Sequence, residues 1–206
     1  GANGAFTWAE MITDINTPRV GYRYNVKQGT YTLAASSTFT GDGTTTSPNI
    51  IRGYKTTIGD ATLGRTNGGE LDVSNMPTIA YNNNFGFAAS GANYLIVESL
   101  VFTGLVGSSL LLVSGTGSLA INCKATNTST GAAIAIENGG SSNTINCDAV
   151  VTAGNSSSVG VSAPGAVIGC RCDMTGSSGQ GIQARNNDKP IELNTIIGGA
   201  IGIKKN

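Results

Sequence analysis

The sequence contains no histidine, and only 12% of its 206 residues are charged. The missing histidine excludes the usual Ser-His nucleophiles and zinc-histidine sites. Twelve acidic residues balance twelve basic ones, so no excess of Lys and Arg favours binding to nucleic acid. We therefore expect no nucleic-acid partner, no cofactor and no histidine-dependent chemistry.

An uninterrupted apolar run long enough to cross a membrane is also missing. The most apolar segment, residues 95–113, contains the polar or small residues Glu98, Gly104, Gly107, Ser108 and Ser109. A membrane-spanning helix needs about 20 predominantly apolar residues, so we expect no membrane span. The chain begins with Gly1 rather than Met, which favours processing from a longer polypeptide.

One short pattern returns five times between residues 94 and 206. Its steps are 23, 24, 23 and 23 residues along the column Leu100, Cys123, Cys147, Cys170 and Leu193. Each copy contains short alternating segments rich in Ile, Val and Thr, broken by Gly, Ser and Asn, with no room for a helix. A fixed period of this length predicts a parallel β-solenoid in which each coil hydrogen-bonds to the next.

The corners of these coils can be placed from the residues that tolerate left-handed backbone. In one coil we expect strands at 119–121, 123–127 and 133–137, with Asn122 as a one-residue corner. Asn146 and Gly169 fall in the same column. Asn and Gly are the residues that accept the conformation such a corner requires, and stacked Asn side chains can bond one another along the axis.

The coil length, the Ile-Asn-Cys corner and the start of the chain resemble right-handed parallel β-helix proteins of the pectate-lyase-like class. Segments 26–33 and 51–60 resemble β-helix proteins of bacteriophages and environmental bacteria. The resemblance implies an all-β, single-stranded right-handed parallel β-helix. It does not imply one function, because the class includes lyases, hydrolases, phage tailspikes, adhesins and structural virion proteins.

We expect one domain with two parts. Residues 1–19 form an N-terminal cap with a short helix, in which Thr7 is the N-cap, Glu10 completes a capping box, and Trp8, Met11 and Ile12 pack onto the open end. Residues 20–206 form the β-helix, with coils of 23–25 residues from residue 94 onward.

The longest departure from the repeat is residues 55–76, called here the insertion. Its polar residues include Arg65, Glu70 and Asp72, which are candidate ligand-binding residues. Long loops without regular structure often carry function, and in lyases of this fold they line the substrate groove. The alternative is a surface loop that packs against the side of the helix or contacts another subunit.

The four cysteines are predicted to point inward as small buried hydrophobic residues. They are Cys123, Cys147, Cys170 and Cys172. Disulfides between neighbouring coils are the alternative, although parallel Cβ vectors suit the disulfide torsion poorly. Metal binding is the least favoured reading, because Cys-x-Cys on one strand lacks tetrahedral spacing.

The outward column beside the cysteines is predicted to be a surface ion-pair ladder, because its charges alternate in sign. It consists of Val101, Lys124, Asp148, Arg171 and Asn194. Such pairs contribute about 0–1 kcal/mol each. We expect this column to serve register and solubility.

The remaining strand carries the candidate catalytic residues. Its predicted inward pairs are Leu111/Val113, Ile134/Ile136, Val159/Val161, Ile182/Ala184 and Ile201/Ile203, with Ala135, Glu137, Gly160, Ser162, Gln183, Arg185, Gly202 and Lys204 outward. The resemblance implies that this face could be a groove, with Arg185 or Lys204 abstracting a proton next to a uronate carboxylate and stabilising the resulting charge. The catalytic candidates are therefore Arg185, Lys204 and Glu137. The ligand-binding candidates on this face are the same three residues and Gln183, and calcium would be needed only in this scheme.

Three hypotheses follow, and the first is preferred. The chain is a non-catalytic structural or adhesive β-helix of a phage virion or an extracellular surface, acting as a homo-oligomer or within a larger assembly and able to bind polysaccharide. It is alternatively a polysaccharide lyase that acts on uronate-containing glycans. Against this, the calcium-site lyases of the class carry several acidic residues on this face and the hydrolases carry paired aspartates, whereas this face carries one acidic residue and no aspartate pair. It is alternatively an extracellular fibre subunit that assembles through an open strand edge.

Overall fold

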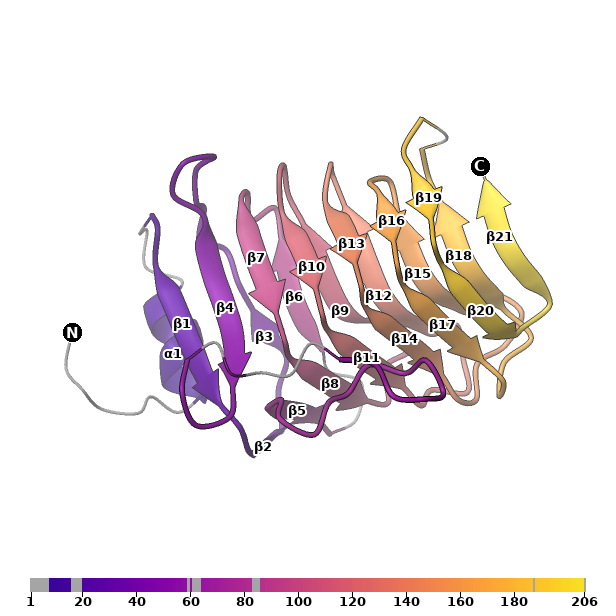
Figure 1. Ribbon diagram of the computed structural model, residues 1–206, viewed down its shortest axis with the longest axis horizontal. Coiled ribbons are helices and arrows are strands. Elements are labelled where there is room, and N and C mark those ends of the chain that lie inside the picture. The colour runs from indigo at the N-terminus through magenta and orange to yellow at the C-terminus, as the bar shows by residue number, and fades with distance from the viewer. Residues whose placement is uncertain are drawn as a thin grey trace.

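The chain folds into a parallel β-solenoid of about seven turns. The structure is a computed structural model that describes residues 8–15, 20–58, 60, 64–82, 86–186 and 188–205. Figure 1 shows the coils stacked along one long axis, with the N-terminus at one end and the C-terminus at the other. The predicted all-β solenoid, with one short helix near the N-terminus, is confirmed.

Each coil contributes one strand to each of three parallel sheets, and each sheet has seven strands among the described residues. Sheet A contains β1 (Arg23–Lys27), β4 (Asn49–Tyr54), β7 (Leu95–Glu98), β10 (Leu119–Ile121), β13 (Asn143–Ile145), β16 (Val167–Ile168) and β19 (Ile191–Glu192). Sheet B contains β2 (Thr30–Leu33), β5 (Thr78–Tyr81), β8 (Val101–Gly104), β11 (Lys124–Asn127), β14 (Asp148–Val151), β17 (Arg171–Met174) and β20 (Thr195–Gly198). Sheet C contains β3 (Ser37–Thr38), β6 (Phe87–Ser90), β9 (Ser109–Ser114), β12 (Ile134–Gly139), β15 (Val159–Ala163), β18 (Gln180–Ala184) and β21 (Ile201–Lys205).

The turn from sheet A to sheet B depends on a single residue with positive φ in each later coil. Asn122 and Asn146 have φ values of 52° and 49°, and Gly169 has 65°. The Asn146 side-chain amide donates to the Asn122 side-chain oxygen at 2.6 Å. The predicted Asn corners and their stacking are therefore confirmed.

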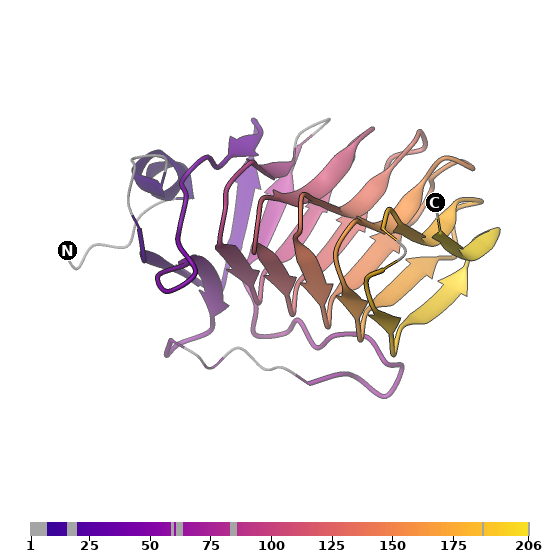
Figure 2. The same cartoon turned by 90° about the horizontal axis from the view of Figure 1, so that it is seen from above.

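Helix α1 (Trp8–Ile15) lies at the N-terminal end of the solenoid (Figures 1 and 2). Trp8 and Met11 are buried within the main core. The Trp8 indole donates to the Ser37 hydroxyl at 2.8 Å and packs edge-on against Phe87, with ring centroids 6.3 Å apart. Thr7, the predicted N-cap, lies outside the described residues.

The last coil is shifted by one residue from the predicted column. Arg171 pairs with Thr195, so Asn194 rather than Leu193 continues the inward cysteine column. Leu193 occupies the corner instead, with φ of 56° and 86% of its surface exposed. Asn194 is held inside by bonds to the Cys170 backbone N–H and the Val167 carbonyl oxygen. The apolar character of Leu193 predicted an inward position. The strand register, rather than hydrophobicity, decides which residue forms the corner.

The predicted inward positions on sheet C are also partly wrong. Ala135 and Gly160 were expected outside, yet both are buried, while Ile134 is half-buried. In each of these strands two successive residues face the core, for example Ala135 and Ile136, so strict alternation fails at this point. The correct column through the core is Phe87, Leu111, Ile136, Val161, Ile182 and Ile203.

Candidate functional site

The insertion, residues 55–76, leaves sheet A after β4 and re-enters sheet B at β5. Figure 2 shows its described part running along the outside of the stacked coils rather than projecting from them. It reaches Asp148 on β14, which lies three strands beyond β5 in sheet B. One segment therefore contacts coils far apart in the sequence.

A small β-hairpin within the insertion positions its contacting residues. Thr66 and Glu70 are joined by a backbone bond of 2.7 Å, and Arg65 and Leu71 form an antiparallel bridge. The Gly69 N–H donates to the Thr66 carbonyl oxygen at 2.9 Å, and Gly69 takes the left-handed conformation with φ of 77°. The hairpin thereby brings Arg65 and Leu71 together against the outer surface of sheet B.

Arg65 uses all five of its N–H donors in contacts within the protein. Nε and Nη2 donate to the Asn146 side-chain oxygen at 3.1 and 2.9 Å, and Nη2 also reaches the Gly169 carbonyl oxygen at 2.8 Å. Nη1 donates to Asp148 Oδ1 at 2.8 Å and to the Gly69 carbonyl oxygen at 2.7 Å. The guanidinium of Arg65, a candidate ligand-binding residue, thus fastens the insertion to two coils.

Asp148 is the buried partner of this contact. Its side chain is 0% exposed, and its second oxygen accepts the Leu71 backbone N–H at 2.6 Å. A buried carboxylate is tolerated when it is paired and its oxygens are hydrogen-bonded. Asp148 meets both conditions only while the insertion lies on sheet B.

The other charges of the column also pair with the insertion, so the predicted ladder within the column is wrong. Glu70 lies 3.4 Å from Arg171 and 3.8 Å from Lys124, and Arg171 additionally pairs with Asp173 at 3.1 Å. Register brings Lys124, Asp148 and Arg171 side by side. Each nevertheless finds its salt-bridge partner outside the column, because the insertion covers them.

Apolar contacts support the same docking. Leu71 and Met76 from the insertion are 2% and 3% exposed, and they form a small cluster with Val101 on the outer face of β8. Full burial of one such side chain contributes about 1.5–3 kcal/mol. Docking therefore combines a buried ion pair with burial of apolar surface.

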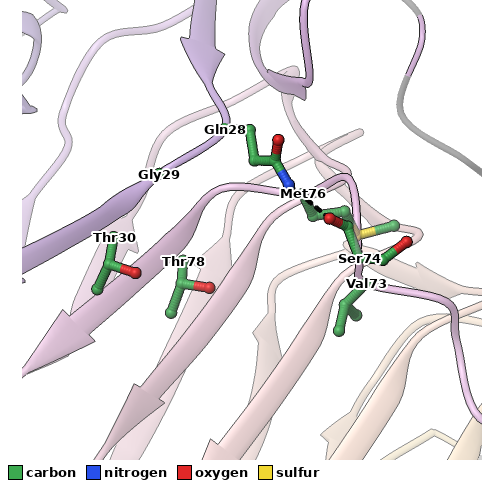
Figure 3. Close-up of a pocket in the computed structure, with 7 residues that line it drawn as sticks. All are labelled: Gln28, Gly29, Thr30, Val73, Ser74, Met76 and Thr78. Carbon is green, nitrogen blue, oxygen red and sulfur yellow. Dashed lines mark hydrogen bonds between the residues drawn. The ribbon is translucent and has the colours of Figure 1, made fainter.

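An open depression of about 400 Å³ lies where the insertion returns to sheet B. Figure 3 shows Gln28 reaching toward Ser74, whose carbonyl oxygen accepts its side-chain amide at 2.5 Å. The lining residues are Gln28, Gly29, Thr30, Val73, Ser74, Met76 and Thr78. They offer hydrogen-bonding groups and no acidic or basic side chain, so the depression does not itself supply acid-base chemistry.

The sheet C face brings together two of its three catalytic candidates. Arg185 Nη2 donates to Glu137 at 2.9 Å and to the Asn138 carbonyl oxygen at 2.6 Å, and the Ser109 hydroxyl also bonds Glu137. Lys204 shares the column of Gln183, Ser162 and Glu137, three strands from Glu137. That separation is about 14 Å, so Lys204 and Glu137 do not act on the same bond.

Gln183 and Arg185 occupy different positions relative to Lys204. Gln183, not Arg185, is in register with Lys204, and its side-chain oxygen accepts the Ser162 hydroxyl at 3.1 Å. Arg185 follows β18 and turns back toward β12. The face therefore carries a surface ion pair between Arg185 and Glu137 and, separate from it, Lys204.

Two aspartates of the insertion act on its own turns. The Asp60 carboxylate accepts backbone N–H bonds from Thr57, Thr56 and Lys55, which hold its pKa well below the ordinary value of 3.8. A backbone bond from Ser74 likewise lowers the pKa of Asp72, another ligand-binding candidate. Both carboxylates fix local backbone.

The cysteines are free and buried, which agrees with the preferred prediction. The Cys123 N–H lies 3.4 Å from Cys147 Sγ, and the Cys147 N–H lies 3.5 Å from Cys170 Sγ. Burial raises the pKa of the Cys147 and Cys172 thiols. The described residues contain no group of three or more Cys, Asp or Glu arranged to hold a metal ion.

Comparison with known proteins adds no family to this description. No protein-family model matches the chain, and no curated protein sequence matches it. Within the described ranges, no helix is long and apolar enough to span a membrane.

Proposed function

We propose that the protein is a non-catalytic structural solenoid of a virion or an extracellular surface, and that two copies of the 206-residue chain join through the coil formed by β19, β20 and β21. The proposal rests chiefly on the contrast between Ile203 and the rest of its core column. Ile136, Val161 and Ile182 are 0% exposed, whereas Ile203 is 46% exposed. A position that is buried in the preceding coils of this column is thus exposed in the last described coil.

The surroundings of Ile203 extend this apolar surface. Ile201 and Ile197 are 45% and 37% exposed, and β19, β20 and β21 are the outermost strands of their sheets. Free strand edges pair readily with another β-strand, and apolar surface beside them favours association. A coil of the same cross-section, from a second copy of the chain, could pair with the strand edges and cover the apolar surface together.

The arrangement of the two ends favours a tail-to-tail pair. At the N-terminal end α1 packs Trp8 and Met11 into the core, so an incoming coil would have to displace it. A contact between two identical C-terminal coils closes on itself with two-fold symmetry and forms a dimer.

The charged candidates also support a structural role. Arg65 and Asp148 bind each other beneath the insertion, and Arg185 is held by Glu137 and a backbone carbonyl. These contacts tie the charged groups to other parts of the fold. They therefore favour a structural role for these residues over contact with a substrate.

The test is light scattering after size exclusion on the 206-residue chain over a range of concentrations. We expect a concentration-dependent dimer that dissociates in Ile203→Lys, because a lysine in that column places two buried charges at the joint. Leu105→Lys is the matched control, since Leu105 is similarly exposed, at 48%, in a loop away from this end. A monomer at every concentration, or dissociation by Leu105→Lys alone, would contradict the proposal.

A further inference from the structure

The sequence contains three Asn-Gly pairs, at Asn3, Asn67 and Asn138. Glycine lacks Cβ, so the backbone nitrogen that follows such an asparagine is unusually accessible. Asn3 lies outside the described residues. The other two asparagines occupy opposite surroundings, which allows a comparison within one chain.

Asn67 lies at the tip of the insertion hairpin and is exposed. The turn is closed by the backbone bond from the Gly69 N–H to the Thr66 carbonyl oxygen, next to the bond that joins Thr66 and Glu70. A Cβ placed on Gly68 would meet only Thr66 Oγ1, at 3.8 Å, so the space around Gly68 is open. Among the described residues, neither the Asn67 side chain nor the Gly68 N–H has a hydrogen-bond partner.

Asn138 differs from Asn67 in its burial, its side-chain hydrogen bond and the strand pairing of its backbone. Its side chain is 0% exposed and donates to the Thr144 hydroxyl at 2.6 Å. It lies within β12, where Asn138 pairs with Val113 and Gly139 with Ser114. Rotation of its peptide group would break this pairing, so the Gly139 nitrogen cannot swing toward the side chain.

We propose that Asn67 is a site of spontaneous deamidation, and that its conversion loosens the insertion from sheet B. The Gly68 backbone nitrogen loses its proton and forms a bond to Asn67 Cγ. The bond from Cγ to the side-chain nitrogen breaks, and the nitrogen leaves as ammonia after taking up a proton. Water then opens the five-membered succinimide at either carbonyl, which yields aspartate or isoaspartate without any change of oxidation state.

The consequence follows from the position of the turn between the two legs of the hairpin. Isoaspartate adds a methylene to the backbone inside the turn, and either product adds a negative charge near Glu70. The legs carry Arg65 and Leu71, which together satisfy both oxygens of buried Asp148. A distorted turn therefore weakens the contact that holds the insertion in place.

The experiment is peptide mapping by mass spectrometry after the folded chain has been aged at mildly alkaline pH. Fragmentation that separates isoaspartate from aspartate identifies both products. We expect Asn67 to convert at least about tenfold faster than Asn138, which corresponds to about 1.4 kcal/mol in activation free energy. Comparable rates in urea-unfolded chain would show that the fold makes the difference, whereas comparable rates in folded chain would overturn the proposal.

Gly68→Ala is the matched control, because Gly68 does not adopt a left-handed φ and an alanine there meets no close neighbour. It should suppress conversion at Asn67 and leave the fold intact. In aged wild-type chain the Leu71 amide, which donates to Asp148, should exchange with deuterium about tenfold faster than in fresh chain. Unchanged exchange at Leu71 after full conversion would refute the proposed loosening.

Discussion

The outer faces of sheets B and C each carry an arginine-carboxylate pair, and the two pairs differ in what covers them. Arg65 and Asp148 lie 2.8 Å apart, and Arg185 and Glu137 lie 2.9 Å apart. Asp148 is 0% exposed beneath the insertion, whereas Glu137 is 24% exposed. The two distances are nearly equal, but loss of the arginine should cost more stability at Asp148 than at Glu137. The reason is that a buried carboxylate left without its partner is also left without water.

The largest effect is expected from Arg65→Ala. This change leaves the Asp148 carboxylate buried without its cation, which should lower the free energy of unfolding by about 3 kcal/mol. If the insertion lifts from sheet B instead, hydrated Asp148 makes the loss smaller, and the Leu71 amide loses its protection from exchange. Urea denaturation followed by circular dichroism measures the first quantity, and hydrogen exchange detects the second.

Two variants separate charge from geometry at this contact. Arg65→Lys keeps the charge but cannot bridge Asn146 and Gly169, so its loss should be intermediate. Combining Arg65→Ala with Asp148→Asn removes the unpaired charge and should recover part of the stability. Full wild-type stability in Arg65→Ala would show that the insertion does not depend on this pair.

A smaller effect is expected from Arg185→Ala on sheet C. Glu137 stays in contact with water after the change, so the free energy of unfolding should fall by about 0–1 kcal/mol. The same denaturation measurement applies, which makes Arg185 the matched counterpart of Arg65. A loss as large as that of Arg65→Ala would remove the distinction between the two faces.

Arg185→Ala also separates the structural proposal from the lyase hypothesis. The lyase hypothesis predicts unsaturated sugar products from a uronate polymer, with loss of these products in Arg185→Ala. The structural proposal predicts none from either protein. Product formation by the wild-type chain that Arg185→Ala abolishes would favour the enzyme.

The smallest effect concerns the turn at Asp60, where the insertion begins. Hydrogen bonds from Thr57, Thr56 and Lys55 favour the charged carboxylate, so its pKa in the folded state lies below the ordinary 3.8. Its contribution is present above pH 3.8 and is lost as the pH falls through the lower folded pKa. The Thr57 amide resonance should titrate in that acidic window and stay constant in Asp60→Asn. A midpoint above 3.8 would contradict this sign.

Local patterns in the sequence predict the repeat and its corners well. The strands expected at 119–121, 123–127 and 133–137 correspond to β10, β11 and β12 to within two residues. They and the Asn122 and Asn146 corners follow from alternation and left-handed backbone, which depend on neighbouring residues. The one-residue shift at Leu193 does not follow from such rules. Leucine fits an inward column by composition, but the register places Asn194 there and satisfies its amide inside the coil.

Docking of the insertion could not be derived from local pattern, because Arg65 and Asp148 are 83 residues apart. A signal was nevertheless present in the sequence. Lys124, Asp148 and Arg171 alternate in sign along one column, and Arg65 and Glu70 carry charges that complement them. Where the insertion carries charges opposite to those of the column, the better prediction is that the insertion covers the column. Ion pairs within the column are then not expected.

The position of Trp8 determines what fluorescence can report about this molecule. Trp8 is the single tryptophan of the chain, and it contacts Ser37 and Phe87 at the N-terminal end. Each coil of a solenoid contacts only its neighbours, so unfolding can begin at one end and advance coil by coil. Indole emission would stay native while the C-terminal coils melted, and the gap between emission and circular dichroism would measure how far that melting has advanced.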